Sequence, residues 1–141
     1  MAGETGLGRL LAGMRPVLAP ETFVFVTIGN GTRPPEGLEP LMTFRESEGL
    51  TLIVSEAQAA AGNLVSTFPC RLITLEIHSS LEAVGFLAAV TARLAARGIG
   101  VNPVAAFHHD HLFVPAGRAI EALETLKALA EESGEGALAM E

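Results

Sequence analysis

The sequence is poor in aromatic residues, cysteine and positive charge. It has no tryptophan, no tyrosine and seven phenylalanines in 141 residues, so aliphatic side chains and backbone must line most of any ligand pocket. The single cysteine, Cys70, excludes an internal disulfide bond and fits a reducing cytoplasm. The nine lysines and arginines are scattered, and the formal net charge is -7. Nucleic-acid binding requires clustered cations, so we expect no nucleic-acid partner.

Long hydrophobic runs are missing as well. Arginine, glutamate or proline interrupts each apolar stretch well short of the roughly 20 residues that cross a membrane. The N-terminus lacks the basic, apolar and small-residue regions of a signal peptide. We therefore expect a cytoplasmic protein without membrane contact. Hydrophobic residues still make up 49% of the chain, which is enough for the core of one domain or two very small ones.

No motif of a known catalytic site is present. The chain has no Gly-x-Ser-x-Gly elbow, no His-Glu-x-x-His zinc motif and no phosphate loop. Cys70 begins the β-prone stretch CRLITLEI, so we expect a buried structural thiol rather than a nucleophile. The sequence therefore favours a non-enzymatic protein without a cofactor.

The predicted elements follow the same order in the two halves of the chain. Hydrophobic periodicity and turn residues predict these elements in the first half: a short helix before Pro16, a strand at 22–28, a proline-rich loop at 33–40, strands at 41–46 and 50–54, and a short helix capped by Ser55. They predict these in the second half: a strand at 71–77, a helix at 79–98, strands at 99–107 and 111–115, and an amphipathic helix at 117–133.

We interpret the two halves as divergent copies of one unit. The division gives a degenerate half with an N-terminal helix at 1–66 and a more regular half with a short flexible tail at 67–141. Their order predicts an α+β fold with an antiparallel sheet and helices on one face, the arrangement of ferredoxin-like proteins. That arrangement requires one more strand after the last helix. The sequence leaves open whether the other half or a partner chain supplies it.

Helix ends and helix faces can also be predicted in the second half. Ser79 and Glu82 fit a Ser-x-x-Glu capping box at the start of the long helix, and Gly98 fits its C-terminal position. In the last helix, the residues expected to face the core are Ile120, Leu123, Leu126 and Ala130.

The stretch FHHDHLFVP holds the densest group of polar side chains. If His109 and Asp110 form a two-residue turn, His108 and His111 lie on one face of a hairpin. With Asp110 they would make half of a zinc or iron site. No second cluster of metal ligands completes it, so we favour a polar hairpin tip without a metal. A metal-dependent enzyme that uses His108, Asp110 and His111 is kept as an alternative.

The stretch EAVGFLAAVTARLAARGIGV resembles the ACT domain, a regulatory module that binds amino acids. The first loop and helix of that family run Asp-x-Pro-Gly-x-Leu, and Glu82, Val84, Gly85 and Leu87 stand at these positions. Residues 98–101 match the turn into the second strand. Together with EGLTLIV, HSSLEAVG and HDHLFVP, the stretch is similar to a small, mostly bacterial family of two-ACT proteins of unassigned activity.

The resemblance implies a ligand site at the start of the long helix, where backbone N–H groups suit a carboxylate. A glycine at position 85 allows close approach of a ligand. The serines would add hydroxyl contacts, and a glutamate or histidine would meet an α-amino group. The residues expected to bind ligand are His78, Ser79, Ser80, Glu82, Val84, Gly85 and Glu48.

We therefore expect a regulatory or sensor protein that binds an amino acid or a similar small metabolite. The site would lie between the two halves or between the subunits of a homodimer. The main alternative is an interaction module that dimerises through its exposed sheet edges without a ligand.

Overall fold

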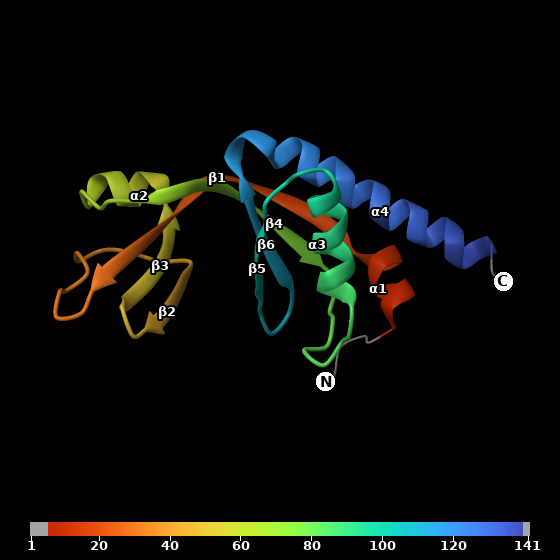
Figure 1. The fold of residues 1–141 in the computed structure, drawn as a ribbon, viewed down its shortest axis with the longest axis horizontal. Helices are drawn as coiled ribbons and strands as arrows, with labels where there is room; N and C mark the ends of the chain where they lie inside the picture. Colours follow the sequence, from red (N-terminus) through yellow and green to blue (C-terminus); the bar gives the residue numbers. More distant parts are fainter. Residues whose placement is uncertain (1–5, 140–141) are drawn as a thin grey trace.

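The computed structural model describes residues 6–139, with side chains through residue 134. One antiparallel sheet of six strands, in the order β2-β3-β1-β4-β6-β5, runs through the molecule. The helices lie along one face of this sheet (Figure 1). The α+β architecture predicted from the sequence is thus confirmed.

The helices and strands have these bounds: α1 Leu7–Gly13, β1 Arg15–Gly29, β2 Met42–Glu46, β3 Gly49–Ser55, α2 Glu56–Ala61, β4 Thr67–Glu76, α3 Phe86–Ala96, β5 Asn102–Ala105, β6 Asp110–Pro115, a 3₁₀-helix Ala116–Arg118, and α4 Ala119–Ala139. Ser55 caps α2 as predicted, because its side chain accepts a hydrogen bond from the Gln58 N–H. Among the described residues, no helix combines the length and apolar character needed to cross a membrane.

Two long strands, β1 and β4, serve both halves of the molecule. Residues 23–29 of β1 pair with β3, whereas residues 15–18 pair with the end of β4. The sheet order therefore contains two overlapping sets of four strands, β4-β1-β3-β2 and β1-β4-β6-β5. The strand that the second half lacks is supplied by residues 15–18 of the first half.

The start of β1 differs from the prediction. We expected a strand from residue 22, with Pro16 simply ending the preceding helix, but β1 begins at Arg15. Pro16 and Pro20 fit here because residues 15–18 pair with β4 on one side only within the described chain. An edge segment tolerates proline since a missing backbone N–H breaks no ladder hydrogen bond on the open side.

The buried core also crosses the boundary between the halves. Leu10 and Met14, at the start of the chain, are 0% and 4% exposed and pack with the core of the second half, which includes Ile73, Leu75 and Leu126. The first half has a smaller cluster on the same face of the sheet, formed by Val24, Val26, Ile28, Leu52, Val54 and Ala59. A third cluster lies on the helix-free face and comprises Phe23, Ile53, Cys70 and Phe113.

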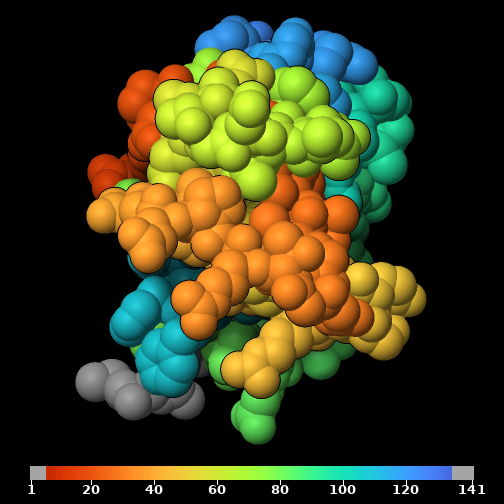
Figure 2. Space-filling view, turned by 90° about the vertical axis from the view of Figure 1, so that its left-hand side faces the viewer, coloured from red at the N-terminus to blue at the C-terminus, as the bar shows by residue number. Residues whose placement is uncertain are grey.

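The first half has no helix between its first two strands. The proline-rich loop, residues 30–41, takes that place and covers the end of the molecule below α2 (Figure 2). Because the loop contains three prolines, Pro34, Pro35 and Pro40, it forms no regular element.

The long helix of the second half starts later than predicted. α3 begins at Phe86, and residues 79–85 form a loop. The capping-box prediction for Ser79 and Glu82 is therefore wrong. The Ser79 hydroxyl donates to Asp110, and the Ser80 hydroxyl accepts from the Glu82 N–H within a turn. Ser79 thus bonds outside the helix that it was expected to cap.

The last helix is longer than predicted, and one of the residues expected to face the core is exposed. α4 extends to Ala139, so residues 134–139 are helical rather than a frayed tail, while Met140 and Glu141 lie outside the described residues. Ile120, expected in the core, is 59% exposed. The other three expected core residues do face the core: Leu126 is buried, and Leu123 and Ala130 are partly buried against it. The fully buried residues of the helix are Ala119, Ala122, Thr125, Leu126 and Leu129.

Candidate functional site

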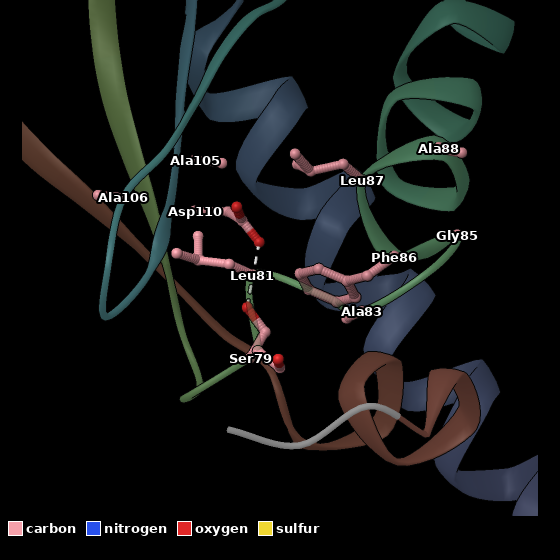
Figure 3. A pocket seen from close by; sticks show the side chains of 11 residues that line it. Ser79, Leu81, Ala83, Gly85, Phe86, Leu87, Ala88, Ala105, Ala106 and Asp110 are labelled. Carbon is pink, nitrogen blue, oxygen red and sulfur yellow. Dashed lines mark hydrogen bonds between the residues drawn. The ribbon is translucent and has the colours of Figure 1, made fainter. Parts of the chain in front are cut away.

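A pocket of about 130 Å³ lies between the start of α3 and the β5–β6 hairpin (Figure 3). The loop before α3, the first turn of α3, the end of β5 and the first residue of β6 form its walls. The residues that line it are Ser79, Ser80, Leu81, Ala83, Gly85, Phe86, Leu87, Ala88, Ala105, Ala106 and Asp110.

Asp110 is the one ionisable side chain in this lining. It is 7% exposed, and the Ser79 hydroxyl donates a hydrogen bond of 3.3 Å to its Oδ2 atom. The register of the sheet holds it in place, because Asp110 lies on the same face of β6 as the core residues Leu112 and Val114. Burial raises the pKa of Asp110, and the hydrogen bond from Ser79 and the nearby histidines offset part of this rise.

The start of α3 forms the opposite wall of the pocket. Gly85 is the N-cap residue and supplies no side chain to bond the first N–H groups of the helix. Those groups lack partners within an α-helix and form its positive end. They belong to Phe86, Leu87 and Ala88, which line the pocket. A buried carboxylate and a bare helix start therefore face one cavity.

Backbone conformation accounts for the glycine at position 85. Its φ angle is +90°, in a region that side chains other than hydrogen rarely adopt. An added Cβ would lie 3.7 Å from Leu7 Cδ2, which is an ordinary contact. A substitution at this position would therefore strain the fold whether or not a ligand binds.

The structure brings only part of the predicted ligand-binding set to the pocket. Ser79, Ser80 and Gly85 line it. The loop also carries His78, Glu82 and Val84, but their side chains are exposed and lie outside the lining. The remaining candidate, Glu48, lies in the β2–β3 turn of the other half, where it accepts a hydrogen bond from Ser47 at 2.9 Å.

Sequence reasoning did not assign Asp110, the one ionisable residue in the pocket lining, to an amino-acid ligand. We considered it only as a metal ligand in a hairpin turn. The signal was nonetheless present in the sequence, since Leu112 and Val114 are spaced by two residues from Asp110 and predict that it faces the core. The small residues Ala105 and Ala106 were not singled out by any pattern.

The predicted hairpin register is wrong, and it separates the proposed metal ligands. Ala105 pairs with Asp110 and Val104 with His111, so residues 106–109 form the loop, closed by a 3.1 Å bond from the Ala106 N–H to the His109 carbonyl. Asp110 and His111, as neighbours in one strand, therefore face opposite sides of the sheet.

The histidines make separate contacts. His111 Nδ1 bonds Thr74 Oγ1 at 2.9 Å, and burial lowers the pKa of His111. His109 Nδ1 lies 3.3 Å from the Ile77 carbonyl oxygen, and His108 is exposed in the loop. Within residues 6–139, no group of three or more histidine, cysteine, aspartate or glutamate side chains is arranged to hold a metal ion.

Comparisons with known proteins identify the family of this fold. The ACT domain family matches residues 2–71 and again residues 67–128. A solved structure of a Vibrio cholerae protein of unknown function, described as a possible transport protein, is 42% identical. The alignment covers 88% of this chain and 95% of that chain, with a TM-score of 0.79. The chain therefore belongs to the ACT domain family and carries two ACT domains in tandem.

More distant structures share the fold. A protein from Agrobacterium tumefaciens is 15% identical over 83% of this chain and 89% of its own, with a TM-score of 0.70. The regulatory subunit of aspartate kinase from Thermus thermophilus is 11% identical over 84% of this chain and 97% of its own, with a TM-score of 0.65. A search of curated proteins gave no match. ACT domains are regulatory modules, and family membership supports a regulatory role for this chain.

Proposed function

We propose that the chain is a non-enzymatic regulatory protein that binds an amino acid, or a similar small metabolite, in the pocket at the start of α3. The observation that carries this proposal is the placement of the buried Asp110 carboxylate opposite the uncapped start of a helix in one cavity. A buried carboxylate without a cation costs stability, so its position is explained by a ligand that brings positive charge.

A zwitterionic amino acid matches both walls of the pocket. Its carboxylate would accept hydrogen bonds from the N–H groups of residues 86–88, where the helix dipole favours negative charge. Its ammonium group would donate to Asp110 and form a charge-assisted hydrogen bond with that carboxylate. The Ser79 hydroxyl donates a hydrogen bond to the same carboxylate.

The two halves differ in a way that supports one site for each chain. We divide the chain into domains at residues 66 and 67, directly before β4. In the first domain, the loop at 30–41 replaces the helix whose start would form an equivalent site. The remaining helix of that domain, α2, begins at Glu56, and the side chain of the preceding Ser55 already caps it. The buried, single Cys70 supports a cytoplasmic location for the protein.

The test is a thermal-shift and calorimetry screen of the twenty amino acids on the full chain. A ligand present at about 100 times its Kd should add roughly 2.7 kcal/mol to the free energy of unfolding, with one ligand bound to each chain. Asp110→Asn should remove this stabilisation, because it keeps the shape of the side chain and removes its charge. Glu82→Gln, which neutralises an exposed acid in the loop before α3, is the matched control and should leave the stabilisation by ligand unchanged. If the ligand stabilises the wild type, Asp110→Asn and Glu82→Gln equally, it binds outside this pocket.

The helix-free face of the sheet supports dimerisation as a second function. Phe44 and Leu41 are 63% and 50% exposed beside a groove of about 420 Å³ that also contains Phe25, Met42 and Val104. Exposed apolar surface of this kind is typical of interaction sites. Sedimentation equilibrium should show a homodimer that Phe44→Glu dissociates. A monomer at all accessible concentrations would exclude this function.

A further inference from the structure

We infer that the chain binds one divalent metal ion that favours nitrogen ligands, of the class of Cu²⁺, Ni²⁺ and Zn²⁺, between the side chains of His78 and His108. This site differs from the one that the sequence suggested, which required Asp110 and His111. The inference is independent of the proposed function, because it needs no amino acid and makes no use of the Asp110 carboxylate.

Three of the four histidines of the chain gather at one end of the molecule. His78 lies in the loop after β4, and His108 and His109 lie in the loop between β5 and β6. Figure 1 shows these two loops at the same end of the sheet. The ring centroids of His78 and His108 are 6.1 Å apart, and those of His108 and His109 are 6.4 Å apart. The chain thus concentrates its imidazole groups where the two loops meet.

The separation of the His78 and His108 rings is compatible with a shared ion. An imidazole nitrogen binds a divalent ion such as Zn²⁺ at about 2.0–2.1 Å, which places the ion roughly 3.2 Å from the centroid of the ring. Two rings on one ion therefore have centroids at most about 6.4 Å apart, and the observed 6.1 Å lies within that limit. Both side chains are exposed, so their rings can turn toward an ion without displacing buried residues.

Contacts around the two rings hold the loops in this arrangement. The Nδ1–H group of His109 donates a hydrogen bond of 3.3 Å to the carbonyl oxygen of Ile77, directly before His78. This bond ties the β5–β6 loop to the end of the chain segment that carries His78. The ring of Phe107 packs against the ring of His108, with centroids 5.0 Å apart. Holding both ligands near their bound positions lowers the entropic cost of binding an ion.

Two imidazoles determine the class of ion that would bind. Imidazole nitrogen suits zinc, copper and nickel, whereas magnesium and calcium require oxygen ligands. For one set of ligands, affinity rises from nickel to copper and falls again at zinc. Because both rings are exposed, water or a small molecule would fill the other coordination positions. The ion would lie at the rim of the pocket, since Ser79, which follows His78, is part of the lining.

Isothermal titration calorimetry on the full, untagged and chelator-treated chain tests the inference with Cu²⁺, Ni²⁺, Zn²⁺ and Mg²⁺ as probes. One Cu²⁺ ion should bind to each chain, at least about tenfold more tightly than Zn²⁺, and Mg²⁺ should not bind. Loss of a ligand costs at least as much as loss of an outer-shell partner, so His78→Ala and His108→Ala should each weaken Cu²⁺ binding about tenfold or more. His111→Ala, the matched control on the opposite face of β6 from Asp110, should alter it by about twofold or less.

Electron paramagnetic resonance of the Cu²⁺ complex gives a readout that a change in folding cannot imitate. The wild type should show two nitrogen ligands from histidine, and each of the variants His78→Ala and His108→Ala should show at most one. The inference is overturned if the wild type binds no Cu²⁺, or if either of these variants binds it as tightly as the wild type. It is also overturned if His111→Ala weakens binding as much as His108→Ala does.

Discussion

Leu10→Ala should destabilise the second half of the molecule, although Leu10 lies near the start of the first half. Leu10 is 0% exposed and packs in the core cluster beside Ile73, Leu75 and Leu126. Its helix, α1, precedes β1, whose residues 15–18 complete the sheet of the second half. The substitution therefore tests whether the chain start belongs structurally to the C-terminal domain.

The expected loss is about 3 kcal/mol in the free energy of unfolding. Buried leucines replaced by alanine cost roughly 2–5 kcal/mol, because the transfer free energy of the removed atoms is lost and a cavity remains. The middle of this range applies because α1 has only seven residues and can relax toward the cavity. Leu7→Ala is the matched control on the same helix. Leu7 is 41% exposed, so its loss should stay below about 1 kcal/mol.

Urea denaturation followed by circular dichroism measures both variants. Leu10→Ala should lower the midpoint of one cooperative transition and the Tm by roughly 10 °C. Val54→Ala, a 0% exposed residue in the core of the first half, should shift that same transition. If Leu10→Ala costs less than about 1 kcal/mol, or if the two substitutions move two separate transitions, the shared-strand reasoning is refuted.

Three further predictions follow from Asp110, Cys70 and β1. Because burial raises the pKa of Asp110, the ligand-free fold loses stability as pH rises through that pKa. The stability of Asp110→Asn relative to wild type should therefore increase from about pH 4 to about pH 7 in paired urea titrations, and a constant difference would contradict this. Burial raises the pKa of Cys70 to about 11, so its alkylation by iodoacetamide near pH 8 should proceed only as fast as unfolding. A 68–141 fragment lacks residues 15–18 and Leu10, and light scattering should show aggregates or dimers rather than a monomer.

The order of elements could be predicted from the sequence because each element carries a local signal. Alternation predicted β3 and β4, and the Ser55 cap placed α2 correctly. The origin of the extra strand could not be predicted, since residues 15–20 contain two prolines and read locally as a loop. Pairing with β4, a contact between residues about sixty positions apart, makes this segment a strand. Long-range pairing of this kind leaves no mark in a short window.

The start of α3 shows how a local signal can mislead. The sequence from Ser79 to Glu82 satisfies the capping-box pattern, but both serine hydroxyls bond elsewhere. Only one residue, Asp110, competes for Ser79, and it lies 31 positions away. The competition depends on the register of β6, which the sequence pattern placed incorrectly by assuming a two-residue turn.

Asp110 is a residue whose presence lowers the stability of the fold and is explained by the proposed function. A sequence that only needed to fold would favour an apolar residue at this place, because positions 112 and 114 of the same strand face are leucine and valine. The aspartate instead holds a carboxylate in a cavity with a single hydroxyl donor among the described residues. Such an arrangement is unfavourable for the empty protein and favourable once a cation is supplied. On the proposed function, the same buried group makes the ligand-free domain less stable and would allow a bound amino acid to stabilise it.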